Sequence, residues 1–87
     1  MREFRLNDEY TVVCESQNTR TGFRHVAILL RNGDEIYRTK CTYQNRTWER
    51  FQFESVLNKT ITNSFTGAEL DEFSAKLATF VRGSILF

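Results

Sequence analysis

The chain has 87 residues, of which 40% are hydrophobic and 26% are charged, and it contains four glycines and no proline. This length and composition are typical of one small folded domain with short turns, and they argue against an intrinsically disordered chain. The net charge of +1 and the isoelectric point of about 7.8 argue against a uniformly basic nucleic-acid-binding domain, whose isoelectric point usually exceeds about 9.

The first ten residues, MREFRLNDEY, carry charges of both signs and lack the apolar stretch of a signal peptide. No segment approaches the roughly 20 apolar residues that a membrane-spanning helix needs. We therefore expect a cytoplasmic protein without a membrane partner. In that compartment Cys14 and Cys41 would be reduced thiols, and two cysteines so far apart in sequence do not suggest a metal site.

Three segments have the pattern of β-strands. Residues 9–17 alternate between two sets of side chains, as a half-buried strand does. Residues 23–31 and 34–43 are both rich in strand-forming side chains, and Asn32-Gly33 between them is the preferred pair for a two-residue type I′ turn. The sequence therefore predicts a three-stranded antiparallel meander.

A two-residue turn would also fix the register of the hairpin, starting with Arg31 opposite Asp34. One face would then carry basic side chains among smaller apolar ones; its basic members are His25, Arg31, Arg38 and Lys40. The other face would be mainly apolar, with Val26, Ile28, Leu30, Tyr37 and Cys41. We expect the apolar face to form the core and the basic face to lie in solvent.

The rest of the chain changes to helical periodicity, which predicts helices over residues 46–61 and 67–82. Asn45 or Thr47 is suited to cap the first of them. The expected fold class is α+β: a three-stranded antiparallel meander followed by two helices packed on one sheet face, in a single domain over residues 1–87.

The first predicted helix has large apolar side chains on two sides. At about 100° per residue, Phe53 and Leu57 fall on one side, whereas Trp48 and Phe51 fall almost opposite. Either the second helix covers Trp48 and Phe51, or the two aromatic rings form an exposed patch that a partner could use.

The sequence contains no group of residues that predicts catalysis. The single histidine, His25, has Lys40 as its expected neighbour, which opposes protonation of the ring and supplies no carboxylate to orient it. Cys14 and Cys41 are strand residues without a histidine partner, and the four glycines are too dispersed to form a phosphate-binding loop. We expect a non-enzymatic protein with no catalytic residue, no cofactor and no bound metal.

Positive charge is concentrated in the middle of the chain. Residues 20–59 carry eight basic and four acidic residues, a net charge of +4, so an anionic partner would be attracted there. A sheet with a basic face can follow the phosphate backbone of a nucleic acid. We therefore expect a nucleic-acid partner; the candidate contacts are Arg20, Arg24, His25, Arg31, Arg38 and Lys40.

A second interpretation is protein binding. Tryptophan and arginine are enriched at the energetic centres of protein interfaces. The candidate contacts are Arg46, Trp48, Arg50 and Phe51. A protein of this kind would modulate or inhibit a host enzyme. An edge strand of the sheet offers a further route, either to such a partner or to a homodimer.

The segment from Gly22 to Leu57 contains a short hairpin around Asn-Gly, then YQNRTWERF, then an aromatic-rich helix. This succession resembles small uncharacterised proteins of phages, prophages and plasmids. The resemblance implies a mobile-element accessory protein that binds and modulates a host or phage macromolecule. It covers 36 of the 87 residues and does not extend to the second helix.

Overall fold

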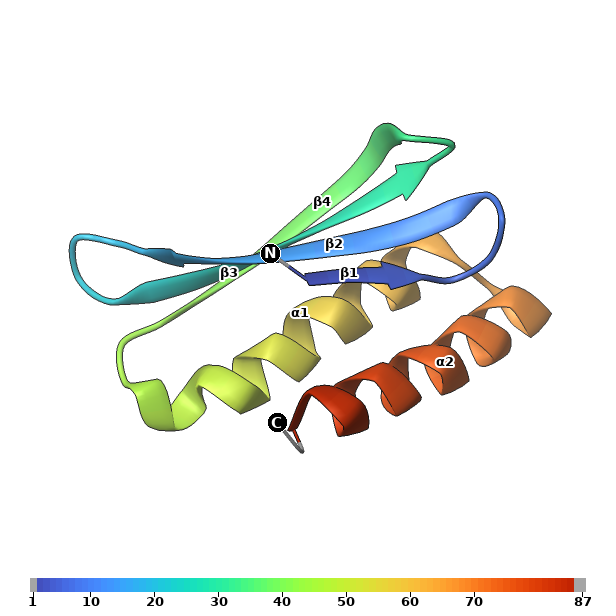
Figure 1. Cartoon of the computed structure of the whole chain (residues 1–87). Coiled ribbons are helices and arrows are strands. Elements are labelled where there is room, and N and C mark those ends of the chain that lie inside the picture. The colour runs from blue at the N-terminus through green and yellow to red at the C-terminus, as the bar shows by residue number, and fades with distance from the viewer. Residues whose placement is uncertain (1, 86–87) are drawn as a thin grey trace.

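A computed structural model describes the backbone of residues 2–85 and the side chains of residues 2–82. A four-stranded antiparallel sheet forms one layer and two helices form the other (Figure 1). The elements in chain order are β1 (Arg2–Arg5), β2 (Tyr10–Asn18), β3 (Phe23–Arg31), β4 (Asp34–Tyr43), the short 3₁₀ helix η1 (Arg46–Trp48), α1 (Glu49–Ser64) and α2 (Gly67–Ile85). The predicted α+β class is confirmed.

The expected number of strands is wrong, because β1 pairs with β2 and extends the meander to four strands in the order β1-β2-β3-β4. Phe4 lies opposite Val12 and is buried, whereas the other three residues of β1 are exposed. A four-residue strand with one buried side chain has too short a pattern to be recognised by periodicity. The sequence therefore predicted the meander without its first strand.

The turn between β3 and β4 has the geometry that the sequence predicts. Asn32 and Gly33 both have positive φ angles, 52° and 90°, as a type I′ turn requires. The register beyond the turn is different from the expected one. Leu30 lies opposite Glu35, but Leu29 lies opposite Tyr37, so Ile36 is an extra residue in β4. Such a β-bulge shifts every later pair by one residue.

The bulge overturns the predicted face of β3, whereas Tyr37 and Cys41 of β4 face the core as predicted. We call the side of the sheet that faces the helices the inner face and the opposite side the outer face. The inner face contributes buried side chains from all four strands: Phe4, Val12, Cys14, His25, Ala27, Leu29, Cys41 and Tyr43. Ile28 and Leu30, which were expected in the core, lie on the outer face and are partly exposed. The β3 face that was expected to be solvent-exposed is therefore the one that packs on the helices.

The two helices run antiparallel beneath the sheet (Figure 1). The Asn45 side chain accepts a hydrogen bond from the Thr47 backbone N–H at 2.9 Å, so Asn45 caps the short helix η1. The buried face of α1 comprises Phe53, Val56, Leu57, Thr60 and Ile61. From α2, Phe73, Leu77 and Val81 are buried in the same core.

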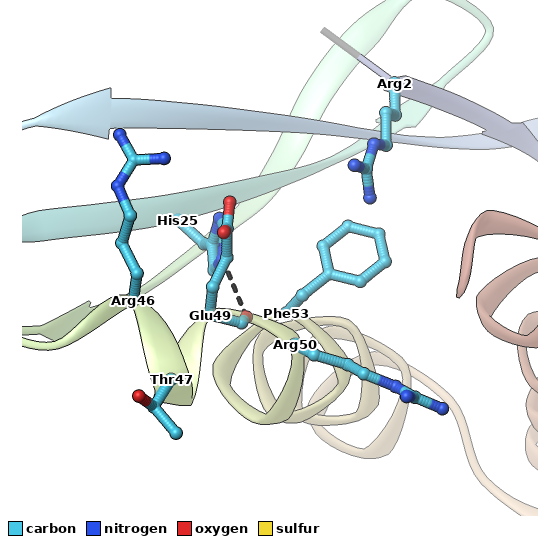
Figure 2. A pocket seen from close by; sticks show the side chains of 7 residues that line it. All are labelled: Arg2, His25, Arg46, Thr47, Glu49, Arg50 and Phe53. Carbon is cyan, nitrogen blue, oxygen red and sulfur yellow. Dashed lines mark hydrogen bonds between the residues drawn. The ribbon is translucent and has the colours of Figure 1, made fainter. Parts of the chain in front are cut away.

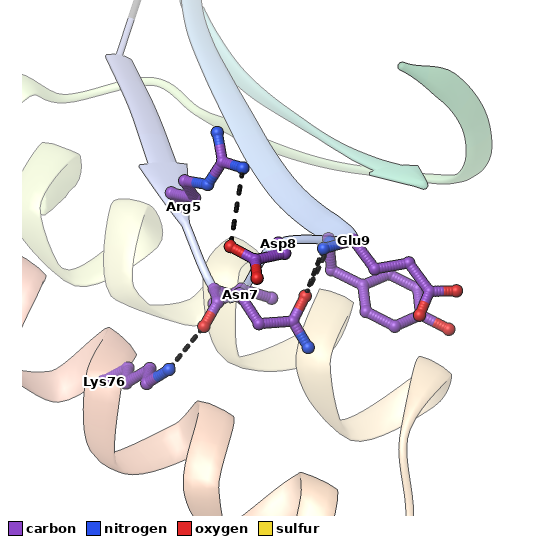
Figure 3. Close-up of polar contacts among 7 residues, drawn as sticks. Arg5, Asn7, Asp8, Glu9 and Lys76 are labelled. Carbon is purple, nitrogen blue, oxygen red and sulfur yellow. Dashed lines mark hydrogen bonds and ion pairs between the residues drawn. The ribbon is translucent and has the colours of Figure 1, made fainter. Parts of the chain in front are cut away.

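Aromatic contacts fix α2 beneath the first two strands. The ring of Phe80 lies 4.5 Å from that of Phe4, centroid to centroid, and Phe73 lies 6.0 Å from Tyr10. At the β1–β2 loop, the Lys76 ammonium donates a hydrogen bond to the Leu6 carbonyl at 2.5 Å (Figure 3). The helix continues to Ile85 and so extends beyond the expected end near residue 82.

The β1–β2 loop itself is closed by a side chain. The Asn7 carboxamide oxygen accepts hydrogen bonds from the backbone N–H groups of Glu9 and Tyr10, at 2.8 and 2.7 Å (Figure 3). This turn reverses the chain so that β1 can pair with β2. Between residues 2 and 85, no helix is both long enough and apolar enough to cross a membrane.

Candidate binding site

Trp48 and Phe51 are exposed, so the second helix does not cover them. Their exposed fractions are 55% and 61%, and their rings form an edge-to-face pair with centroids 6.1 Å apart. Phe51 lies two residues before the buried Phe53, about 200° around the helix, so it points away from the sheet. α2 lies beside α1 in the helical layer (Figure 1) and leaves this pair uncovered.

A groove of about 840 Å³ runs beside these two rings. Its walls come from three parts of the chain: the β2–β3 turn, the end of β4 and the first turns of the helical segment. Phe23 and Tyr43 also line it, and their rings stack on each other with centroids 5.4 Å apart. Aromatic side chains from the sheet and from the helix thus share one open surface.

Gly22 brings the two sides of this groove together. A Cβ atom on Gly22 would lie 2.5 Å from the Tyr43 carbonyl oxygen and 3.0 Å from the Gln44 Cα. These contacts are too short, so the β2–β3 turn and the backbone of residues 43–44 would have to move apart. The β2–β3 turn can therefore approach the end of β4 closely because residue 22 has no side chain.

Two arginines lie at the groove, and a third precedes Phe51 in the sequence of α1. Arg24 lines the groove and donates hydrogen bonds to the Gln17 side chain at 2.8 and 3.1 Å. The Arg46 guanidinium lies 4.8 Å from the ring centroid of Phe23, and Arg50 lies next to Phe51 in α1. Within residues 2–82, no carboxylate lies within 4 Å of any of these three guanidinium groups.

We call this surface the aromatic–arginine site; it consists of Phe23, Arg24, Arg46, Trp48 and Phe51. It combines Arg24 from the predicted nucleic-acid contacts with three of the four residues predicted to contact a protein. The fourth, Arg50, does not line the groove and lies instead at a second cavity. Arg20, another predicted contact, lies exposed in the β2–β3 turn that forms one wall of the groove. The sequence placed these residues in two alternative sites, whereas the structure brings them together at one end of the molecule.

The predicted basic sheet face is wrong as a single surface. Arg38 and Lys40 lie on the outer face, where Arg38 pairs with Glu35 at 2.7 Å. Arg31 lies at the far end of β3 and forms an ion pair with Glu9. His25 is buried on the inner face, with an exposed fraction of 2%. The bulge at Ile36 is the reason, because it shifts the register by one residue and so separates the β3 face that carries His25 from the β4 face that carries Arg38 and Lys40.

A second cavity, of about 280 Å³, lies between the sheet and the start of α1 (Figure 2). Its lining residues are Arg2, His25, Arg46, Thr47, Glu49, Arg50 and Phe53. Figure 2 shows the Arg2 and Arg46 side chains on opposite sides of the cavity, with Glu49 between them. The Arg2 guanidinium lies 4.6 Å from the ring centroid of Phe53. Arg2 is not among the residues predicted from the sequence, because the pattern of the four-residue strand β1 is too short to be recognised.

His25 lies at the wall of this cavity and makes two hydrogen bonds. Its Nε2 lies 3.0 Å from the backbone carbonyl oxygen of Glu49, which can only accept, so Nε2 carries the proton. Its Nδ1 therefore accepts a hydrogen bond from the Ser16 hydroxyl at 2.8 Å. Burial lowers the pKa of His25 below its usual value of 6.5, which favours this neutral form. His25 thus has Ser16 and Cys41 as cross-strand neighbours, and not the expected Lys40.

The Cys14 thiol is unsuited to nucleophilic chemistry at neutral pH. Cys14 and Cys41 are both free and buried. Burial raises the pKa of the Cys14 thiol to about 11, so the thiolate is scarce near pH 7. Within the described residues, no three side chains of histidine, cysteine, aspartate or glutamate are grouped as metal ligands would be.

No protein-family model, no curated protein and no solved structure matches the chain.

Proposed function

We propose that this protein is a small non-enzymatic binding module and that its aromatic–arginine site binds single-stranded nucleic acid. The observation that carries the proposal is the exposure of Trp48 and Phe51 beside arginines that have no acidic partner among the side chains of residues 2–82. Bases of an unpaired strand stack on aromatic side chains, and guanidinium groups bind the phosphates between them. Both parts of such a site are present on this surface.

The accessibility of the aromatic side chains favours an unpaired strand over a duplex. Stacking on Trp48 or Phe51 requires a base whose flat face is free, and the bases of a duplex stack on one another instead. The outer sheet face is also a poorer surface for a duplex, because Arg38 is already paired with Glu35. Lys40 and Arg24 supply further positive charge along the outer face near the groove.

In this proposal the protein is an accessory protein of a mobile element. The resemblance of the segment from Gly22 to Leu57 to small phage, prophage and plasmid proteins supports that setting, and this segment contains the whole aromatic–arginine site.

Titration with unlabelled oligonucleotides, followed by the intrinsic fluorescence of Trp48, tests the proposal. Single-stranded DNA and RNA should quench the emission at low salt and bind more weakly as salt rises, because binding releases counterions. Replacement Trp48→Ala, followed by fluorescence anisotropy of a labelled strand, should weaken binding roughly 5- to 150-fold, since one base stack contributes about 1–3 kcal/mol. The matched control is Ile36→Ala, which changes another exposed apolar side chain, 51% exposed, on the sheet edge.

Two results would contradict this function. One is the absence of any binding at low salt with the protein folded, as judged by circular dichroism. The other is an affinity that does not change with salt, because a phosphate-dependent complex must lose affinity when salt is added.

The second candidate function is binding of a protein through Trp48 and Phe51, or through the free edge of β4. The exposed Ile36 on this edge strand is the observation that favours it, since unpaired strand edges add strands from partners or from a second copy. Capture of one stoichiometric partner that survives nuclease treatment and is lost in Trp48→Ala would favour this candidate over nucleic-acid binding.

A further inference from the structure

We propose that the cavity lined by Arg2, Arg46 and Arg50 binds the terminal phosphate of the strand, so that the protein recognises a phosphorylated end of single-stranded nucleic acid. This inference rests on the proposed function, because it assigns a partner group to a second cavity beside the aromatic–arginine site. It adds a specificity for strand ends that stacking on Trp48 and Phe51 does not provide.

The charge of the cavity fits a terminal phosphate. Arg2, Arg46 and Arg50 contribute three positive charges and Glu49 one negative charge, which leaves a net charge of +2 next to a neutral His25. A terminal phosphate monoester carries a charge of about −1.5 to −2 near pH 7. A phosphodiester within the strand carries a single negative charge, so the terminal group matches the cavity better.

Two of the cavity's arginine side chains are already held in place. Arg2 lies over the ring of Phe53 and Arg46 lies over the ring of Phe23, at 4.6 and 4.8 Å from the ring centroids. Within residues 2–82, none of the cavity's three arginines has a carboxylate within 4 Å. An entering phosphate would therefore meet guanidinium groups that need not first leave an acidic partner, and Arg2 and Arg46 would lose little freedom on binding.

The size of the cavity is compatible with a phosphate group. The buried side chains of His25 and Phe53 form its inner wall, and its volume is about 280 Å³. The match of charge, and not the shape of the cavity, favours the end of a strand over a phosphodiester within it.

The cavity and the groove are neighbours. Helix η1 separates them: Arg46 and Thr47 line the cavity, and Trp48 lines the groove. Arg46 also contacts Phe23, which belongs to the groove. The terminal phosphate and the first bases of one strand can therefore occupy both at once.

The test compares three versions of one oligonucleotide, with a 5′-phosphate, with a 3′-phosphate and with hydroxyl groups at both ends. Binding to the full chain is followed by Trp48 fluorescence at one fixed salt concentration. One phosphorylated end should bind at least tenfold more tightly than the hydroxyl-ended strand. Glu49→Gln should increase this preference, because it removes the acidic group of the cavity.

The variants Arg2→Gln and Arg50→Gln should abolish the preference and leave the affinity for the hydroxyl-ended strand within about twofold of wild type. The matched control is Arg5→Gln, because Arg5 lies in the same short strand but on its other face, paired with Asp8. Circular dichroism of each variant checks the fold, and Arg50, which is exposed on α1, provides the test independently of β1.

Equal binding of all three oligonucleotides by the wild-type protein would overturn the terminal-phosphate site and leave the proposed function intact. Absence of binding to all three would instead overturn the proposed function. A third result would also overturn the inference. If the three oligonucleotides bind equally and inorganic phosphate, at the same concentration as the oligonucleotide, displaces all of them, the cavity is a site for free phosphate.

Discussion

At the scale of single residues, His25 connects the sheet to the first turn of α1. Its two ring nitrogens bond to Ser16 of β2 and to the Glu49 carbonyl, so one buried ring ties three elements together. Both bonds depend on the neutral ring, because a protonated Nδ1 could no longer accept the Ser16 hydrogen bond.

Protonation of His25 should therefore destabilise the fold. Burial lowers its folded-state pKa below 6.5, so the unfolded chain binds the proton more tightly and the free energy of unfolding falls as the pH drops below 6.5. The slope contributed by one group is at most about 1.4 kcal/mol per pH unit. Urea unfolding of wild type and His25→Gln between pH 7.5 and 5.0 should show this loss in the wild type alone; parallel curves for the two proteins would contradict it.

Some residue roles follow from the sequence and others do not. Asn45 as a cap, Asn32-Gly33 as a turn, and Trp48 opposite Phe53 depend on local geometry that a few neighbouring residues determine. The burial of His25 depends on which face of β3 meets the helices, and that choice involves residues far away in the sequence.

At the scale of elements, the β-bulge at Ile36 decides which side chains of the hairpin share a face. The sequence predicted a strict two-residue alternation from the turn onward, and one extra residue in β4 was enough to shift every later pair by one residue. The bulge leaves Ile36 half exposed, and it places the helix-facing side chains of β4 beside the β3 face that was expected in solvent. No local signal in DEIYRT marks this position.

The β2–β3 turn depends on Gly22. Replacement Gly22→Ala should lower the free energy of unfolding by about 1–3 kcal/mol, because the added Cβ overlaps the Tyr43 and Gln44 backbones. It should also weaken oligonucleotide binding, because the turn forms one wall of the groove. Urea unfolding and the Trp48 titration measure the two effects. Thr21→Ala, in the same turn, is the control, and equal stability of the two variants would contradict the close approach.

At the scale of the whole molecule, the aromatic residues divide into a buried set and an exposed set. Phe4, Phe53, Phe65 and Phe73 pack between the sheet and the helices, whereas Trp48 and Phe51 lie outside this core. The periodicity of the sequence predicted this division for the first helix. It could not predict whether α2 would cover the second set, because helical periodicity does not determine how two helices pack.

A pair of phenylalanine replacements tests this division. Phe73→Ala should lower the free energy of unfolding by about 3–5 kcal/mol, because Phe73 is 1% exposed and its removal leaves a cavity. Phe51→Ala should change it by no more than about 0.5 kcal/mol, because Phe51 is 61% exposed. Thermal and urea unfolding of both variants provides the comparison. A large loss of stability in Phe51→Ala would show that this ring belongs to the core.

The fold class is thus predictable from the sequence, and the binding surface is predictable in part. Apart from Phe23, which was not predicted, the residues of the aromatic–arginine site were found as members of two separate sites, because their meeting depends on the end of the sheet lying next to η1. Arg2 was missed entirely, since a strand of four residues gains its position from pairing with β2 and not from its own pattern.

The short edge strand β1 pairs only with β2, and two of its residues have different contacts. Phe4 fixes it to the core, and Arg2 reaches the cavity beside His25. Edge strands of this length open more readily than the strands between them. An anion that binds Arg2 must therefore also favour the docked state of β1, so the affinity of the cavity and the stability of the sheet edge are thermodynamically coupled.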